Sequence, residues 1–231
     1  MGSNIVERLL SEGQDVRVLD DLSTGHKRNL ASFLEGNSGG SSKYSGSLEL
    51  VVGDIRDRDV VRRTMEGVSY VFHQAALPSV PRSVENPTES ISVAVDGTLS
   101  VLEAARDAGV KRLVYAASSS AYGANETVPK KEVFRPEPLS PYAAGKLAAE
   151  HLCKVFWECY GLETVSIRYF NVFGPRQDPN SPYAAVIPKF IDAFLDSRAP
   201  VVYGDGLQTR DFTFVDNVVE ANLRASEAPK E

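Results

Sequence analysis

Two patterns of apolar residues alternate along this 231-residue chain. Short apolar runs of about five residues, typical of buried strands, are separated by longer stretches with the character of helices. The predicted strands are Asp15–Leu19, Leu48–Val52, Tyr70–His73, Arg112–Ala117 and Thr164–Arg168. The predicted helices are Ser3–Ser11, a short piece near Gly25–Leu34, Arg58–Glu66, a long helix within Pro87–Ala108, and Pro141–Tyr160.

The alternation of strands and helices predicts βαβ units that share a parallel sheet. We therefore predict the α/β class, with a Rossmann-like, doubly wound parallel sheet. In such a sheet the ligands bind beyond the carboxyl ends of the strands. Candidate chemistry is accordingly expected just after each strand.

The residue pattern changes near Asn171. Beyond this point, frequent prolines predict only short helices and strands. We predict a Rossmann-like domain in residues 1–170 and part of a smaller, substrate-binding lobe in residues 171–231, with the substrate cleft between them. Residues 36–47 are rich in glycine and serine and predict a flexible surface insertion.

Charge and composition narrow the range of partners. The net charge is −6, so the chain lacks the basic surface that nucleic acids and anionic membranes attract. No apolar run reaches the roughly 18 residues of a membrane span, and the amino terminus has no signal-peptide core, so we expect a cytoplasmic protein. Cys153 and Cys159 lack the spacing of a bridge or metal site, and the histidines are scattered. We predict no metal.

The strongest chemical signal combines a serine run with a tyrosine–lysine pair. Ser118, Ser119 and Ser120 end a predicted strand, and the helix that begins at Pro141 carries Tyr142 and Lys146 on one face. An ammonium beside a phenol favours the tyrosinate and lowers its pKa from about 10, which predicts a base at Tyr142. Ser118 is placed to hold a substrate hydroxyl against it. The tyrosine–lysine pair alone is more often two solvated side chains; the serines favour acid/base chemistry beside a nicotinamide ring.

Residues that follow the other strands indicate a dinucleotide site. Asp20 ends the first predicted strand, where a carboxylate accepts hydrogen bonds from the adenosine ribose and favours NAD over NADP. On its own, an aspartate there is as often a turn residue. Asp54-Ile55 follows the next strand and could hold the adenine edge. Gln74-Ala75-Ala76 follows the third and has the small side chains needed where a backbone passes close to a cofactor.

A dinucleotide site also needs a strand and a glycine-rich turn before the first helix, yet Met1–Ile5 already begins that helix. Gly2 would be the last glycine of the turn, which permits close packing of helix and strand. The strand would lie in the middle of the sheet, so its neighbours would lose hydrogen-bond partners. We expect the printed chain to be an incomplete version of its parent.

Several motifs together resemble the extended short-chain dehydrogenase/reductases, and within them the UDP-hexose 4-epimerases. The resemblance covers nearly the whole chain and is nearest to the bacterial UDP-N-acetylglucosamine 4-epimerases of surface-polysaccharide synthesis. The motifs are Val18–Gly25, Gly53–Asp57, Ala117–Gly123, Ser140–Tyr142 with Lys146, Arg168–Gln177, and Gly204–Gly206 followed by Thr209–Phe212.

This resemblance implies roles for individual residues. Tyr142 would be the base, Lys146 would contact the nicotinamide ribose, and Ser118 or Ser119 would bind the hexose hydroxyl. Further cofactor contacts would come from Gly2, Asp20, Asp21, Asp54, Ile55, Gln74, Ala75, Ala76 and Tyr169. Further substrate contacts would come from Ser79, Ser120, Asn171, Ala185, Val186 and Arg210. Asn171 and Arg210 are expected on the nucleotide diphosphate; the alternatives are a surface salt bridge for Arg210 and core packing for Tyr169.

The activity implied is NAD-dependent epimerisation at C4 of a UDP-sugar, through a 4-keto intermediate, in a cytoplasmic homodimer. Ala121 stands where dehydratases and many decarboxylases carry acids, which disfavours those reactions. The serine loop also permits a uronic-acid 4-epimerase. A third interpretation is a non-catalytic fragment that binds nucleotide weakly, because the first strand is missing and Ala94 stands where an asparagine commonly faces the cofactor.

Overall fold

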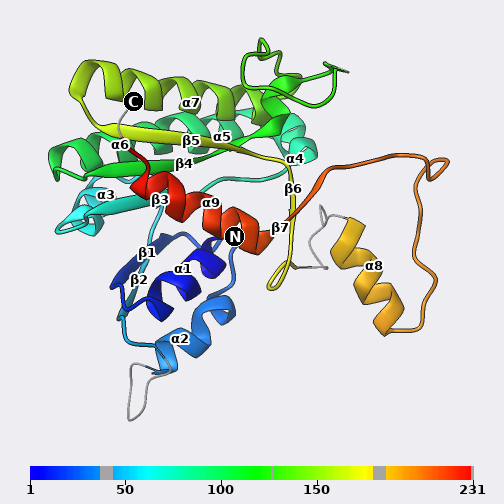
Figure 1. Ribbon diagram of the computed structural model, residues 1–231, viewed down its shortest axis with the longest axis horizontal. Coiled ribbons are helices and arrows are strands. Elements are labelled where there is room, and N and C mark those ends of the chain that lie inside the picture. Colours follow the sequence, from blue (N-terminus) through cyan, green and yellow to red (C-terminus); the bar gives the residue numbers. More distant parts are fainter. Residues whose placement is uncertain (37–43, 126, 179–185, 230–231) are drawn as a thin grey trace.

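The computed structural model describes residues 1–36, 44–125, 127–178 and 186–229, which form parallel sheets flanked by helices (Figure 1). Strand β1 (Val16–Asp20) pairs in parallel with β2 (Leu48–Val52). Strand β4 (Arg112–Ser118) lies between β3 (Tyr70–His73) and β5 (Glu163–Tyr169), also in parallel. The predicted α/β class is confirmed, and the predicted strands lie within one residue of the observed bounds.

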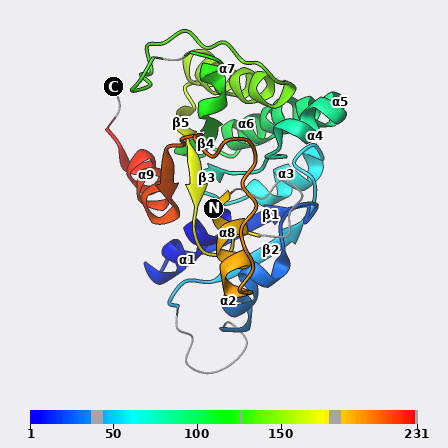
Figure 2. The same cartoon turned by 90° about the vertical axis from the view of Figure 1, so that its right-hand side faces the viewer.

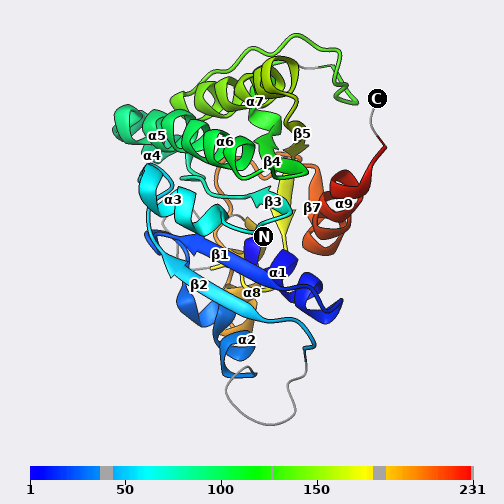
Figure 3. The same ribbon diagram turned by 90° about the vertical axis from the view of Figure 1, so that its left-hand side faces the viewer.

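The sheet is divided between β1 and β3. The β1–β2 pair and the three-stranded sheet β3–β4–β5 are separate (Figure 3), and no strand among the described residues is hydrogen-bonded between them. A division of this kind is compatible with the prediction that the neighbours of a missing central strand lose hydrogen-bond partners. That a further strand belongs there stays a prediction.

Helices cover both faces of the three-stranded sheet (Figures 1 and 3). On one face lie α6 (Thr98–Asp107) and α7 (Pro141–Tyr160), with α3 (Arg58–Met65) packed against α6. On the other face α9 (Val215–Glu227) packs against β4 and β5 and beside α1 (Gly2–Ser11). The remaining helical segments before β4 are η1 (Lys27–Leu30), α2 (Ala31–Gly36), α4 (Val80–Glu85), α5 (Pro87–Ser92) and the π-helical turn η2 (Val93–Gly97).

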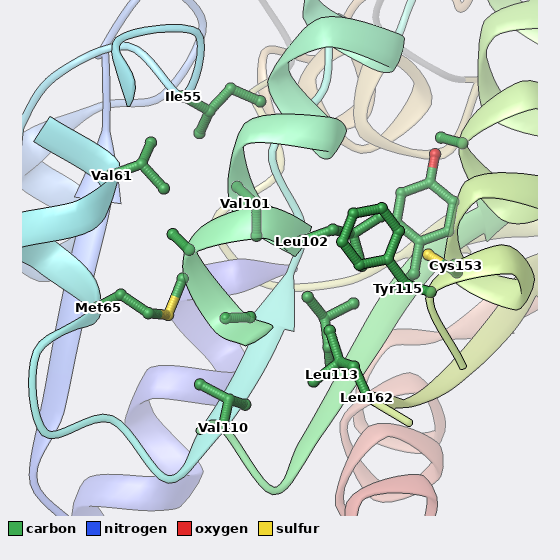
Figure 4. Close-up of a cluster of buried hydrophobic side chains, with 14 of the residues drawn as sticks. Ile55, Val61, Met65, Val101, Leu102, Val110, Leu113, Tyr115, Cys153 and Leu162 are labelled. Carbon is green, nitrogen blue, oxygen red and sulfur yellow. The ribbon is translucent and has the colours of Figure 1, made fainter. Parts of the chain in front are cut away.

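The main hydrophobic core lies between β4 and the helices α3, α6 and α7 (Figure 4). Leu113 and Tyr115 point from β4 toward Leu102 of α6 and Cys153 of α7, and all four side chains are almost completely buried. The alternation of side chains along a strand puts Leu113, Tyr115 and Ala117 on this one face. The core therefore fixes α7 directly over the carboxyl half of β4.

The long helix predicted within residues 87–108 is a continuous run of α5, η2 and α6. The last residue of the π-helical turn, Gly97, lies against Ile55, whose Cδ1 would be 2.5 Å from a Cβ at position 97. Helix α4 was not predicted.

Beyond β5 the chain forms a second small parallel pair, β6 (Asn171–Phe173) with β7 (Phe212–Phe214). Helix α8 (Val186–Leu195) lies apart from the main sheet (Figures 1 and 2). Most of the predicted glycine- and serine-rich insertion, residues 37–43, lies outside the described residues.

Candidate active site

The serine turn and the tyrosine helix meet at the carboxyl end of β4. Ser118 ends the strand and caps η3 (Ser119–Tyr122), accepting a hydrogen bond from the Ser120 amide at 3.2 Å. Ser140 caps α7 in the same way, accepting from the Ala143 amide at 3.1 Å, and Pro141 occupies the first turn. Both caps are what Ser and Pro favour at helix starts.

The phenol of Tyr142 is close enough to the side chain of Ser118 for the serine to act on its pKa. Burial raises the pKa of the Tyr142 phenol, and Ser118 opposes this rise. Ser118 in turn accepts a hydrogen bond from the Ser120 hydroxyl at 2.8 Å. Because Ser118 Oγ accepts from Ser120, its own proton is available to donate to the oxygen of Tyr142 or to a substrate hydroxyl. Ser119, which lies between Ser118 and Ser120 in the sequence, is half-buried.

Lys146 is one turn along α7 and is 4% exposed. Its ammonium donates to the Ala116 carbonyl at 2.7 Å and lies 4.9 Å from the centre of the Tyr115 ring. Burial lowers the pKa of Lys146 to about 8. The expectation that Lys146 brings the pKa of Tyr142 down is not met, because the ammonium is directed at β4 and burial of the phenol raises its pKa.

A group of buried side chains around His73 lies near Lys146. His73, 4% exposed, ends β3 and makes a 3.0 Å hydrogen bond with the Thr98 hydroxyl. Its ring lies 5.5 Å from that of Tyr115, centre to centre. Burial and the nearby charge of Lys146 lower the pKa of His73 to about 3, so it is uncharged at neutral pH. Sequence reasoning missed this group, whose members come from separate elements.

The residues predicted for the adenosine end lie after β1 and β2. Asp20 accepts from the Leu22 amide at 2.7 Å, and Asp21 accepts from the Ser23 amide at 2.9 Å, so both close turns. Asp54 is bonded to Arg56, which holds the pKa of that carboxyl below its usual range. The side chain of Ile55 is in the hydrophobic core, which leaves only its backbone to contact a ligand.

Two predicted cofactor residues are engaged with α9. Gln74 donates to the Tyr169 hydroxyl at 3.2 Å and to Asn222 at 3.1 Å, and Tyr169 is bonded to Asn222. Tyr169 packs in the small core between the sheet and α9, which is the alternative that the sequence left open. The half-buried Ala75 and Ala76 follow Gln74.

Gly2 is the first residue of α1. A Cβ added there would have no atom within 4 Å. The close helix–strand packing predicted for this glycine is therefore not seen among the described residues.

The residues predicted for the substrate fall into two groups. Ser79 is buried and caps α4, accepting from the Arg82 amide at 3.1 Å. Asn171, at the start of β6, donates to the carbonyl of Asp211 at 3.0 Å. The neighbouring Arg210 is exposed, and its guanidinium donates to the Thr209 carbonyl at 2.7 Å. Val186 begins α8, next to a groove of about 410 Å³. Ala185 lies outside the described residues.

A family model described as the NAD dependent epimerase/dehydratase family matches residues 1–231. The chain belongs to this family. It is 41% identical over 227 residues to the UDP-glucose 4-epimerase of Mycolicibacterium smegmatis, covering 97% of this chain and 69% of that protein. Over 227 residues it is 39% identical to a putative UDP-glucose 4-epimerase of Methanocaldococcus jannaschii, covering 97% and 70%.

Solved structures of the epimerase/dehydratase family have the same fold. A UDP-N-acetylglucosamine 4-epimerase from Methanobrevibacter ruminantium, in complex with UDP-N-acetylmuramic acid, matches with a TM-score of 0.89 at 41% identity, covering all of this chain and 70% of that one. A Thermus thermophilus UDP-glucose 4-epimerase complex with NAD matches with a TM-score of 0.84 at 37% identity, covering 99% and 72%.

The residues of this family member fit the NAD for which the family is named. A Cβ at Gly25 would be 3.0 Å from both carboxylate oxygens of Asp20, so glycine leaves that acceptor accessible to ribose hydroxyls. Gln74 Oε1 is a buried acceptor without a partner among the described residues, close in sequence to the small Ala75 and Ala76. Within the same residues no helix has the length and apolar character to span a membrane, and no cluster of metal-type ligands occurs.

Proposed function

We propose that this protein interconverts the C4 epimers of a UDP-sugar, either UDP-glucose and UDP-galactose or their N-acetyl counterparts. The observation that carries the proposal is the hydrogen-bonded pair Ser120–Ser118 beside the phenol of Tyr142, one helical turn from the buried Lys146. Relatives of similar sequence are named UDP-glucose 4-epimerases, and one solved relative is a UDP-N-acetylglucosamine 4-epimerase.

Each polar group of the site has a task in this reaction. NAD, held by the residues that follow β1 and β3, would supply the redox chemistry at C4 of the sugar. Tyr142, as the phenolate that Ser118 favours and burial opposes, would accept the proton of the 4-hydroxyl and later give it back. Ser118 donates to the oxygen that carries negative charge at each stage, and Lys146 supplies a fixed positive charge in a site from which water is largely excluded.

The nucleotide half of the substrate would lie farther along the chain. Asn171 donates to the carbonyl of Asp211, the residue that follows Arg210, and the guanidinium of Arg210 suits the oxygens of a diphosphate. We therefore propose that Asn171 and Arg210 bind the diphosphate, and that residues 171–231 contribute the smaller, substrate-binding lobe. Helix α9, although within that range, packs against β4 and β5.

We further propose a cytoplasmic homodimer that serves surface-polysaccharide synthesis. Support for self-association comes from α7, where Trp157 and Tyr160 are 37% and 54% exposed. The two residues are three apart and therefore neighbours on the helix surface, and exposed large apolar side chains favour burial against a second copy. Sedimentation of the purified protein tests this, with a monomer at micromolar concentration as the contradicting result.

The catalytic proposal is tested by supplying NAD and, separately, UDP-glucose, UDP-N-acetylglucosamine and UDP-glucuronate, and separating the epimers by chromatography. We expect conversion of a neutral or N-acetyl sugar. Turnover of the uronate alone would replace the substrate proposed here with a uronic acid. No turnover, together with no heat when NAD is titrated in a calorimeter, would favour the non-catalytic interpretation.

A further inference from the structure

A buried arginine joins the three chain segments that carry the chemistry. Arg168, near the end of β5, donates two hydrogen bonds to the Glu150 carboxylate, from Nε at 3.0 Å and from Nη2 at 2.6 Å. The flat guanidinium also lies over the ring of Tyr122, with Cζ 4.8 Å from the ring centre. Both side chains of the ion pair are largely buried, at 14% and 20% exposure.

Both partners of Arg168 belong to elements of the site. Glu150 lies on α7, four residues beyond Lys146 and eight beyond Tyr142, so the three side chains share one helix face. Tyr122 is the last residue of η3, the turn that begins with Ser119 and is capped by Ser118. Tyr122 is 4% exposed and its other neighbour is Phe170, stacked at 6.4 Å between ring centres.

We infer that Arg168, with Glu150 and Tyr122, is a positioning group that sets the separation between the side chains of Ser118 and Tyr142. Arginine can make a two-point contact with a carboxylate and stack its plane on an aromatic ring at once, which lysine cannot. The guanidinium thereby holds the serine turn and α7 at a fixed separation. Ser118 caps that turn, and Tyr142 lies on α7. This inference rests on the proposed function, in which both hydroxyls act on the same substrate oxygen.

The chain offers a matched control at the opposite end of β4 and β5. Arg112, at the start of β4, makes a two-point contact with Glu163 of β5, at 3.0 Å and 2.6 Å. This pair is at least as buried, at 8% and 15% exposure, and Arg112 also donates to the carbonyl of Ala225. Arg112→Lys therefore perturbs a comparable ion pair in the same sheet, remote from Tyr142.

The first test observes Tyr142 directly, in the protein without added cofactor. Carbon-13 NMR of ring-labelled tyrosines follows the phenol carbon of Tyr142, assigned by its disappearance in Tyr142→Phe. Ser118→Ala gives the signal for a Tyr142 phenol that has lost its serine neighbour. We expect Arg168→Lys to move the resonance in the same direction as Ser118→Ala and to shift its titration to higher pH, while Arg112→Lys leaves both unchanged.

The second test measures turnover and KM with saturating NAD. A displacement of about 1 Å at the reacting groups costs on the order of 100-fold in rate. We therefore expect the kcat of Arg168→Lys to fall by about 10- to 100-fold, with KM little changed. Tyr122→Leu, which removes the stacking partner, should lower kcat similarly. The double variant should be no slower than the slower single variant, because both substitutions act through one contact.

The two proposals fail separately. An inactive wild-type protein would contradict the proposed function, and the NMR comparison would still judge the role of Arg168. An active wild type whose Tyr142 signal and kcat respond to Arg168→Lys no more than to Arg112→Lys would overturn the positioning role. Should Arg168→Lys fail to fold, Tyr122→Leu supplies the same comparison.

Discussion

Acid should destabilise this protein through one buried histidine. His73 is hydrogen-bonded to Thr98 and its ring packs near that of Tyr115. The positive charge of Lys146 also acts on the imidazole. Burial, and secondly the charge of Lys146, lower its pKa from 6.5 to about 3. The perturbation is a change of pH from 7 to 5, over which the imidazole remains uncharged in the folded protein and becomes charged in the unfolded chain.

The sign and size follow from proton linkage. Because the pKa is lowered in the folded state, the unfolded chain binds more protons below pH 6.5, and stability falls as the pH drops from 6.5 toward 3. A gap of one pKa unit is worth about 1.4 kcal/mol. Between pH 7 and pH 5 His73 should therefore remove about 2 kcal/mol from the free energy of unfolding.

The assay is denaturant unfolding at pH 7, 6 and 5, followed by the fluorescence of Trp157 and by circular dichroism. His73→Phe keeps a ring against Tyr115 and cannot titrate. The wild type should lose about 2 kcal/mol more than the variant between pH 7 and pH 5, whatever constant offset the substitution introduces. Equal pH dependence in the two proteins would refute the buried, uncharged imidazole.

Two further predictions concern the walls of the site. Lys146→Met removes a charge that burial disfavours, as the lowered pKa of about 8 indicates. Thermal unfolding should therefore show no loss of stability, although epimerase turnover should disappear. A lower melting temperature of the variant would contradict this. Gly123→Ala should cost about 3 kcal/mol in denaturant unfolding, because φ is +60° and the new Cβ would lie 1.9 Å from the Glu137 carbonyl oxygen. The control Gly161→Ala, with positive φ but open space, should cost about 1 kcal/mol, and equal losses would refute the clash.

Strands β1 to β5 and the nearness of Ser118 to Tyr142 could be predicted because their signals are local. A buried strand needs an apolar run, so β2 and β3 were predicted at their observed bounds. The spacing of Tyr142 and Lys146 on a helix fixes their common face, and serines after β4 fall beside that helix wherever the sheet is parallel. The effect of Ser118 on the pKa of Tyr142 agrees with that reasoning. The short strands β6 and β7 were not predicted.

Partners that are distant in sequence could not be predicted. The direction of the Lys146 ammonium depends on the Ala116 carbonyl, and the fate of Gln74 and Tyr169 depends on Asn222 of α9. Arg168 carries no sign in sequence of its contact with Glu150. Propensity and spacing describe one element at a time, whereas these contacts exist only after α7 and α9 have packed on opposite faces of the sheet.

The most direct test of the central claim is Tyr142→Phe. The substitution removes one hydroxyl and keeps the ring, so bound NAD, measured by calorimetry, should be unchanged. Turnover of the UDP-sugar should fall on the order of 1,000-fold, the effect of losing a positioned acid/base group. Wild-type turnover in this variant, or loss of NAD binding in place of turnover, would contradict the assignment of Tyr142 as the group that moves the proton.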